Sequence, residues 1–225
     1  IEDGTIYMTL RSYAALTGHA LAWEDGAAWL TGKGLELQAS PGALYFESNG
    51  RALYVPETVS VSQGKLVLPL RVLCQATGAG LSWDAQSATV TLNTVGARPA
   101  TANYDEEDLY WLSRIISAES RGEPLIGQIA VGNVVLNRVK STEFPNSVKD
   151  VIFDTRYAIQ FEPVANGTIY APPTSSALLA AKLCLEGASV VGDCLYFFAP
   201  SLSPGTWIVN NRTYFTTIGA HQFYL

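Results

Sequence analysis

One carboxylate in the sequence stands where it could act as a catalytic acid. Leu112 and Ile116 recur at helical spacing, and the same period places Glu119 on their apolar stripe. Burial without a partner disfavours the charged form of a carboxyl group and raises its pKa, which is the state that a general acid needs near neutral pH. Gly122 and Pro124 end the helix soon afterwards, so Glu119 could instead tilt into solvent. Spacing alone leaves both interpretations open.

Helices must position this carboxylate. Four acidic residues at 105–108 suit the positive end of a helix dipole and predict that the first helix begins there. The next helix, over residues 127–139, is apolar almost all round. Asn133 and Asn137 lie one turn apart on it and either satisfy buried backbone groups or face a groove, and we favour the groove for Asn137.

Several short motifs follow one another from residue 105 to the C-terminus. They are AESRGEP at 118–124, GQIAVGNVVLNRV at 127–139, QFEPVANG at 160–167, LYFFAP at 195–200 and IGAHQFY at 218–224. In this order they resemble the spore-cortex-lytic cell wall hydrolases of the SleB/CwlJ type. Ser120 departs from the family pattern, which usually carries Ala there, and leaves the chemistry intact. The resemblance implies a mainly helical, lysozyme-like fold with a groove for glycan.

The resemblance also implies that Glu119 is the catalytic acid. Its carboxyl group would protonate the glycosidic oxygen while positive charge develops at the sugar C1. A hydrolase normally needs a second carboxylate, whereas a lytic transglycosylase does not, because the muramic acid 6-hydroxyl attacks C1 and leaves a 1,6-anhydro end. Glu123 and Glu162 are weak candidates for that second group. We therefore expect a transglycosylase, with a hydrolase as the alternative.

We expect a further set of residues to contact the substrate: Arg121, Glu123, Asn137, Phe161, Tyr196 and His221. Arg121 and Arg138 could hold a peptide-stem carboxylate, although structural ion pairs are the more common role. The aromatic side chains, Trp207 included, could stack on sugars, although core packing is more common. Glu123 has a structural role as its alternative. His221 has no metal-ligand spacing and is interpreted as a structural or groove-lining imidazole.

The first 95 residues contain an internal repeat at an offset of 60. LRSYAALTGHALAWE at 10–24 aligns with LRVLCQATGAGLSWD at 70–84, so that Leu-Arg, Thr-Gly and Leu-x-Trp recur. Each copy predicts a short helix ended by glycine, a strand, a turn and a second strand, at 27–31 and 88–92. Further strands are predicted at 44–46, 52–55 and 65–68, with turns at Asn49-Gly50 and Gln63-Gly64.

This repeat resembles the small β-rich domain named after the N-terminal region of copper amine oxidases, above all in LVLPLR at 66–71 and LSWD at 81–84. Copper is not implied, because His19 and Cys74 stand at unrelated repeat positions. We expect no metal and no cofactor anywhere in the chain. A spacer or wall-docking role is the modest interpretation. The repeated Arg and Trp could mark a binding face, but we favour packing of each Trp against the helix of its own repeat.

Together these patterns predict an α+β chain with two domains. Residues 1–95 form the β-rich repeat domain, residues 96–104 a small polar linker, and residues 105–225 the mainly helical catalytic domain. The length of 225 residues suits two small domains.

The composition argues against two kinds of partner, nucleic acid and the interior of a membrane. A formal net charge of -6 argues against binding of nucleic acid, and the apolar runs are too short to span a bilayer. The sequence opens at Ile1 without a signal-peptide pattern, so we expect a signal peptide to have been removed and the protein to be secreted. Cys184 and Cys194 either pair in an oxidising compartment or stay free, and Cys74 is expected to be a buried thiol. The oligomeric state is unknown from sequence.

Two other functional classes stay open. A non-catalytic wall-binding protein would be expected to lack the acid, and Glu119 is present. A Ser or Cys amidase would need a nucleophile with a nearby base, and no such signature occurs in the sequence. We therefore expect an enzyme that acts on peptidoglycan glycan strands.

Overall fold

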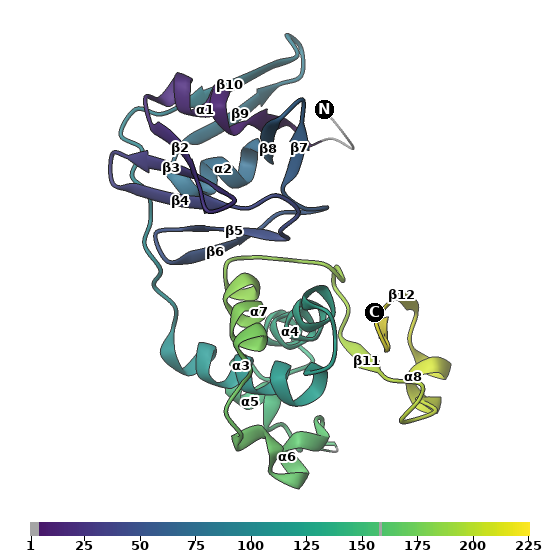
Figure 1. Cartoon of the computed structure of the whole chain (residues 1–225). Helices are drawn as coiled ribbons and strands as arrows, with labels where there is room; N and C mark the ends of the chain where they lie inside the picture. Colours follow the sequence, from purple (N-terminus) through teal and green to yellow (C-terminus); the bar gives the residue numbers. More distant parts are fainter. Residues whose placement is uncertain (1–4, 158) are drawn as a thin grey trace. The chain divides into compact units, whose positions relative to one another are not determined.

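The computed structural model describes residues 5–157 and 159–225 (Figure 1). The chain divides into two compact units, residues 1–103 and 104–225, so the division falls within the predicted linker. Each unit has a hydrophobic core of its own. Among the described residues, no helix is both long and apolar enough to span a bilayer.

The N-terminal unit consists of antiparallel strands and two short helices. In chain order its elements are β1 (Tyr7–Thr9), α1 (Leu10–Thr17), β2 (Ala20–Glu24), β3 (Ala27–Gly32), β4 (Leu35–Ala39), β5 (Tyr45–Ser48), β6 (Arg51–Tyr54), β7 (Ser60–Ser62), β8 (Lys65–Pro69), α2 (Leu70–Thr77), β9 (Gly80–Asp84) and β10 (Thr89–Asn93). One sheet has the order β2-β3-β4-β5-β6, a second has the order β1-β8-β7, and β9 pairs with β10. Three of these strands, β1, β4 and β7, were not predicted, although the apolar alternation along β4 is the pattern of a half-buried strand.

The two copies of the repeat face each other across an antiparallel strand pair. β1 and β8 lead into α1 and α2, and Met8 lies opposite Leu68, its own equivalent at the offset of 60. An antiparallel pair of equivalent strands in this register relates the copies by a local two-fold axis. The buried hydroxyls of Tyr13 and Thr77, 2.6 Å apart, join the helices of the two copies. The repeat therefore folds as one unit with one core.

Two-residue turns close several hairpins of this unit. Asp25-Gly26, Asn49-Gly50 and Gln63-Gly64 all have positive φ at both positions, as type I′ turns require. The second copy of the repeat differs, because residues 85–88 form a four-residue connection between paired Asp84 and Thr89. Consequently β10 starts at residue 89 rather than at the predicted 88.

The favoured packing of the repeated tryptophans was wrong. Trp23 is 59% exposed and Trp83 is 51% exposed. Trp23 lies on β2, the edge strand of its sheet, and every residue of β2 is exposed, so the indole has no core to enter. The same holds for Trp83 on the isolated β9–β10 hairpin, in which only Leu81, Val90 and Leu92 are partly buried.

The C-terminal unit is mainly helical and carries a small sheet. Its elements are α3 (Glu106–Ser120), α4 (Leu125–Lys140), α5 (Val148–Ile152), α6 (Glu162–Asn166), the 3-10 helix η1 (Thr168–Tyr170), α7 (Ser175–Leu185), β11 (Tyr196–Phe198), α8 (Thr206–Asn211), β12 (Tyr214–Ile218) and β13 (His221–Tyr224). The sheet has the order β11-β13-β12. The Asp105 side chain accepts a hydrogen bond from the backbone N–H of Asp108 and caps α3 at the predicted start.

Helices α3, α4 and α7 pack against one another around a small residue. A Cβ at Gly132 on α4 would lie 2.7 Å from Cys184 Sγ and 2.8 Å from Ile116 Cδ1, so only glycine lets the three helices approach this closely. All three cysteines are free and buried, and Cys184 donates to the carbonyl of Ile129. The pairing of Cys184 with Cys194 that the sequence left open does not form in the structure.

Candidate active site

Glu119 lies in the last turn of α3 and lines a groove of about 510 Å³. The helix runs one residue beyond it, so the side chain keeps its place on the inward stripe and does not tilt away at a helix end. The groove is lined from α3, α6, η1 and the segments around them by Arg114, Ser117, Ala118, Glu119, Arg121, Glu162, Pro163, Asn166, Thr168, Ala171 and Leu202.

The surroundings of Glu119 favour its protonated form. The pKa of this carboxyl group is raised from 4.5 to about 7, chiefly by burial and also by the negative charge of Glu162, while the positive charge of Arg138 acts in the opposite direction. No hydrogen bond joins the Glu119 carboxyl group to any residue that the structure describes. Its proton is therefore available to a ligand in the groove at neutral pH.

Arg138 on α4 is the cation that limits the rise in the pKa of Glu119. It is only 5% exposed, and its Nε donates to the Leu195 carbonyl at 2.7 Å while Nη1 donates to Gln160 Oε1 at 3.4 Å. Burial lowers the pKa of Arg138 to about 10, and the negative charges around it, Glu119 among them, work against that shift. Because its hydrogen bonds and burial fix its position, Arg138 is a stationary positive charge near the acid.

A second groove, of about 710 Å³, lies on the other side of Arg138 and is rich in aromatic and cationic groups. The guanidinium of Arg212 lies over the ring of Tyr196 at 4.4 Å and over that of Trp207 at 5.2 Å, and its Nη2 donates to the Tyr196 hydroxyl. Gln160 lines this second groove and Glu162 lines the first, so the two grooves are separated by a short stretch of backbone.

Two known families match the chain. The model of the family described as Cell Wall Hydrolase matches residues 122–224, and that of the Copper amine oxidase N-terminal domain matches residues 1–106. The first match begins three residues after Glu119, so the role of that residue rests on the geometry given above.

Curated relatives and a solved structure extend the match. Spore cortex-lytic enzymes of Bacillus cereus and Bacillus subtilis strain 168 are 40% and 37% identical over 120 residues, which is 53% of this chain and 45% and 38% of theirs. The chain thus spans less than half the length of these relatives. The catalytic domain of the germination-specific lytic transglycosylase SleB from Bacillus anthracis is 38% identical, with a TM-score of 0.50, over 56% of this chain and 100% of that domain. The C-terminal unit is a cell wall hydrolase domain.

Two asparagines of this cell wall hydrolase unit serve the backbone. Asn133 is buried, donates to the Ala188 carbonyl and accepts from the Val190 N–H. The amide of Asn137 donates to the carbonyls of Gly192 and Cys194, at 2.8 and 3.0 Å. Asn137 is not among the residues that line either groove, and its amide supports the backbone of the loop after α7.

Glu123 and His221 form a structural pair at the β12–β13 turn. Glu123 Oε2 accepts from the Ala220 N–H at 3.0 Å, and Oε1 lies 3.8 Å from His221 Nδ1. His221 is 7% exposed and packs edge-on against Phe197, and burial lowers its pKa while Glu123 opposes that shift. Neither side chain lines the described part of either groove. The structure thus places both in structural roles rather than at the expected substrate contacts.

The remaining expected contacts divide between core and groove. Phe161 is 3% exposed and packs on Phe197, so the structure does not present it for sugar stacking. Arg121 is exposed and lines the groove of Glu119. Tyr196 lines the second groove, where Trp207 packs against it.

Several groove residues were not predicted from the sequence. Arg114, Asn166 and Thr168 line the first groove, and Arg212 lines the second. Asn166 lies within the QFEPVANG motif, which was a usable signal, whereas Arg212 lies between motifs and is found only through its stacking on Tyr196. Among the described residues, no group of three or more His, Cys, Asp or Glu side chains could hold a metal ion.

Proposed function

We propose that this chain cleaves the glycan strands of peptidoglycan as a lytic transglycosylase, with Glu119 as its general acid and base. The observation that carries the proposal is a single carboxyl group with a pKa of about 7 in a groove of about 510 Å³. The likeness to spore cortex-lytic enzymes supports the substrate class.

In this mechanism one carboxyl group moves the proton twice. Protonated Glu119 donates to the glycosidic oxygen as the bond to the muramic acid C1 breaks. The resulting carboxylate then accepts the proton of the 6-hydroxyl as that oxygen bonds to C1. Glu119 returns to its starting state, no water is consumed, and a 1,6-anhydro end remains. Arg138 stabilises the intermediate carboxylate, because its fixed charge favours the ionised form.

A hydrolase is the second candidate, and Glu162 is the observation in its favour. Its carboxylate lines the same groove and is close enough to raise the pKa of Glu119. A retaining or inverting glycosidase would use such a group as nucleophile or as base for water. In the transglycosylase mechanism Glu162 has only an electrostatic role.

Export to the cell wall or the spore follows from the same proposal, because the substrate lies outside the cytoplasm. The chain must meet peptidoglycan to act on it, and relatives described as spore cortex-lytic suggest the cortex as one target.

The test is mass spectrometry of soluble fragments released from purified spore cortex and from vegetative peptidoglycan. Wild type, Glu119→Gln and Glu162→Gln are compared at equal concentration. We expect anhydro-ended fragments from wild type and from Glu162→Gln, and a loss of at least about a thousandfold in Glu119→Gln, which cannot donate a proton.

If wild type released fragments with reducing ends and Glu162→Gln released none, the enzyme would be a hydrolase and not a transglycosylase. Unchanged turnover in a folded Glu119→Gln variant would remove Glu119 from the mechanism. Binding to both walls without any fragments from wild type would leave a non-catalytic wall-binding protein.

A further inference from the structure

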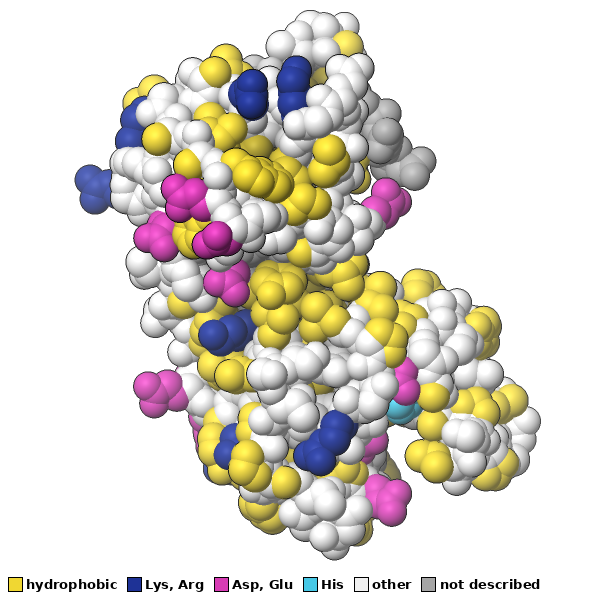
Figure 2. Space-filling view, viewed as in Figure 1, with side chains coloured by type: hydrophobic (Ala, Val, Ile, Leu, Met, Phe, Trp, Pro, Cys, Tyr) yellow, Lys and Arg dark blue, Asp and Glu magenta, His cyan; other side chains and the backbone are white. Residues whose placement is uncertain are grey.

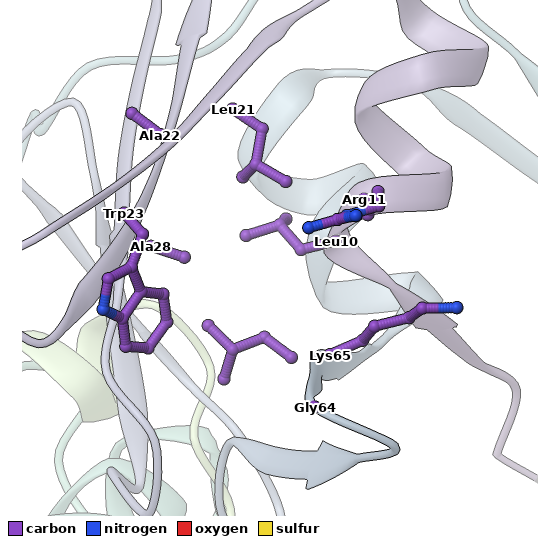
Figure 3. Close-up of a pocket in the computed structure, with 9 residues that line it drawn as sticks. Leu10, Arg11, Leu21, Ala22, Trp23, Ala28, Gly64 and Lys65 are labelled. Carbon is purple, nitrogen blue, oxygen red and sulfur yellow. The ribbon is translucent and has the colours of Figure 1, made fainter.

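The N-terminal unit carries a pocket that the catalytic chemistry does not use. It has a volume of about 150 Å³ and is lined by Leu10, Arg11, Leu21, Ala22, Trp23, Ala28, Gly64, Lys65 and Leu66. Figure 3 shows the Trp23 indole on one side, the Arg11 side chain on the opposite side with its guanidinium directed toward the pocket, and Leu10 and Leu21 between them. The space-filling view shows hydrophobic side chains gathered on the face near β7 and β8 (Figure 2).

The pocket combines a buried apolar floor with exposed recognition groups. Leu10, Ala28 and Leu66 are at most 7% exposed and form the floor. Trp23 is 59% exposed, and Arg11 and Lys65 at the rim are exposed as well. Figure 3 shows Arg11 directed toward the pocket and Lys65 directed away from it. In a chain of net charge -6, the Arg11 cation across the pocket from an exposed indole favours a ligand that has both a flat apolar face and a negative charge.

The second copy of the repeat differs from the first in the residue that lies beside its tryptophan. Trp83 occupies the position equivalent to Trp23, but the residue opposite it on the paired strand is Val90, whereas Trp23 lies opposite Ala28. The longer turn of the second hairpin causes this change of partner. The small side chain of Ala28 leaves room beside the Trp23 indole, and Val90 is larger than alanine. The position equivalent to Lys65 is Thr5, which carries no charge.

We propose that this pocket binds a sugar of the peptidoglycan strand, as a docking site separate from the groove of Glu119. The Trp23 indole stacks on the apolar face of the ring, and Arg11 pairs with a carboxylate of the lactyl group or of the peptide stem. The choice of this ligand rests on the proposed function, since it is the polymer that the C-terminal unit would cleave, and it matches the pocket in having both N-acetylated sugars and carboxylates.

The experiment measures binding of the full chain to insoluble peptidoglycan that has been stripped of proteins. Glu119→Gln is the parent, so that the polymer stays intact, and Trp23→Ala, Arg11→Gln and the matched control Trp83→Ala are added to it. We expect binding to be about tenfold weaker for Trp23→Ala. Binding should be several-fold weaker for Arg11→Gln, and it should depend less on the salt concentration. Trp83→Ala should change binding by less than about twofold. Trp23 is exposed, so its variant should fold, and circular dichroism checks this.

Chitin, which has the N-acetylated sugar without lactyl groups or stems, separates the two contacts. Trp23→Ala should weaken binding to both polymers, and Arg11→Gln should weaken binding to peptidoglycan alone. Unchanged binding of Trp23→Ala would overturn the proposal, and so would an equal loss in Trp83→Ala. If the chain bound only to walls from which the proteins had not been stripped, the ligand of the pocket would be a wall protein instead.

Cleavage assays keep this result apart from the proposed function. With Glu119 restored, Trp23→Ala should cleave short soluble glycan fragments at the wild-type rate and insoluble walls more slowly. If wild type cleaves nothing while binding still depends on Trp23, the docking site stands and the catalytic proposal fails.

Discussion

At the scale of the residue, the properties of Glu119 come from groups that are distant in sequence. Burial in the groove and the charge of Glu162 favour its protonated form, and Arg138, held by the carbonyl of Leu195, limits the effect. The balance places the pKa of this carboxyl group at about 7, where it can both lose and regain a proton near neutral pH.

The raised pKa of Glu119 makes the folded state less stable as the pH rises. Between pH 4.5 and about 7 the unfolded chain releases this proton while the folded chain keeps it, so stability is lost across that window and the penalty is complete above it. Glu119→Gln removes the penalty. We expect its free energy of unfolding to exceed that of wild type by about 2 to 3 kcal/mol at pH 8 and to match it near pH 4.

Denaturant titrations at both pH values check this expectation. Glu24→Gln, at an exposed position of β2, is the control and should behave as wild type at both. An equal stability of wild type and Glu119→Gln at pH 8 would contradict the raised pKa.

At the scale of the element, the helix that carries Glu119 depends on a close approach of three helices. Gly132 on α4 lets the side chains of Ile116 on α3 and Cys184 on α7 meet its backbone. The position of Glu119, one turn after Ile116, follows from this packing.

Gly132→Ala should destabilise the protein although alanine favours helices. The added methyl group would lie under 3 Å from both neighbours, and such overpacking costs about 1 to 3 kcal/mol, against a gain in helix propensity of about 1. We expect a net loss of up to about 2 kcal/mol, measured by denaturant unfolding. Gly122→Ala is the matched control, because nothing lies within 4 Å of its added Cβ, and it should be close to neutral. Equal stability of the two variants would show that the helices can move apart.

At the scale of the whole molecule, each unit has its own core. The N-terminal cluster runs from Leu10 to Ala76 and draws on both copies of the repeat, while a cluster in the C-terminal unit joins α4 to the loop after α7 and to β13. A core that is complete within one unit is the property of a domain that folds alone.

We therefore expect residues 104–225, produced alone, to unfold cooperatively and to retain cleavage of short soluble glycan fragments within about twofold of the full chain. Calorimetry and the fragment assay measure the two properties. A fragment that is unfolded, or that loses activity on soluble fragments, would show that the N-terminal unit completes the catalytic unit.

The sequence by itself determined the features that depend on neighbours along the chain. The stripe that carries Glu119, the cap at Asp105, the I′ turns such as Asn49-Gly50 and the offset of 60 between the repeats all follow from local spacing and backbone chemistry. The motif order was likewise enough to indicate the family.

The tertiary structure alone decided which distant groups meet. The Asn137 amide donates to the carbonyls of Gly192 and Cys194, which are more than 50 residues away in sequence. Arg138, on a different helix, supplies the positive charge that lowers the pKa of Glu119. The two tryptophans of the repeat occur in the same motif, yet their strand partners differ. Trp23 lines a pocket and lies opposite Ala28, whereas a longer turn places Val90 opposite Trp83. Spacing along a chain specifies the face on which a side chain lies, whereas the partner on the other side of that face depends on how the elements pack.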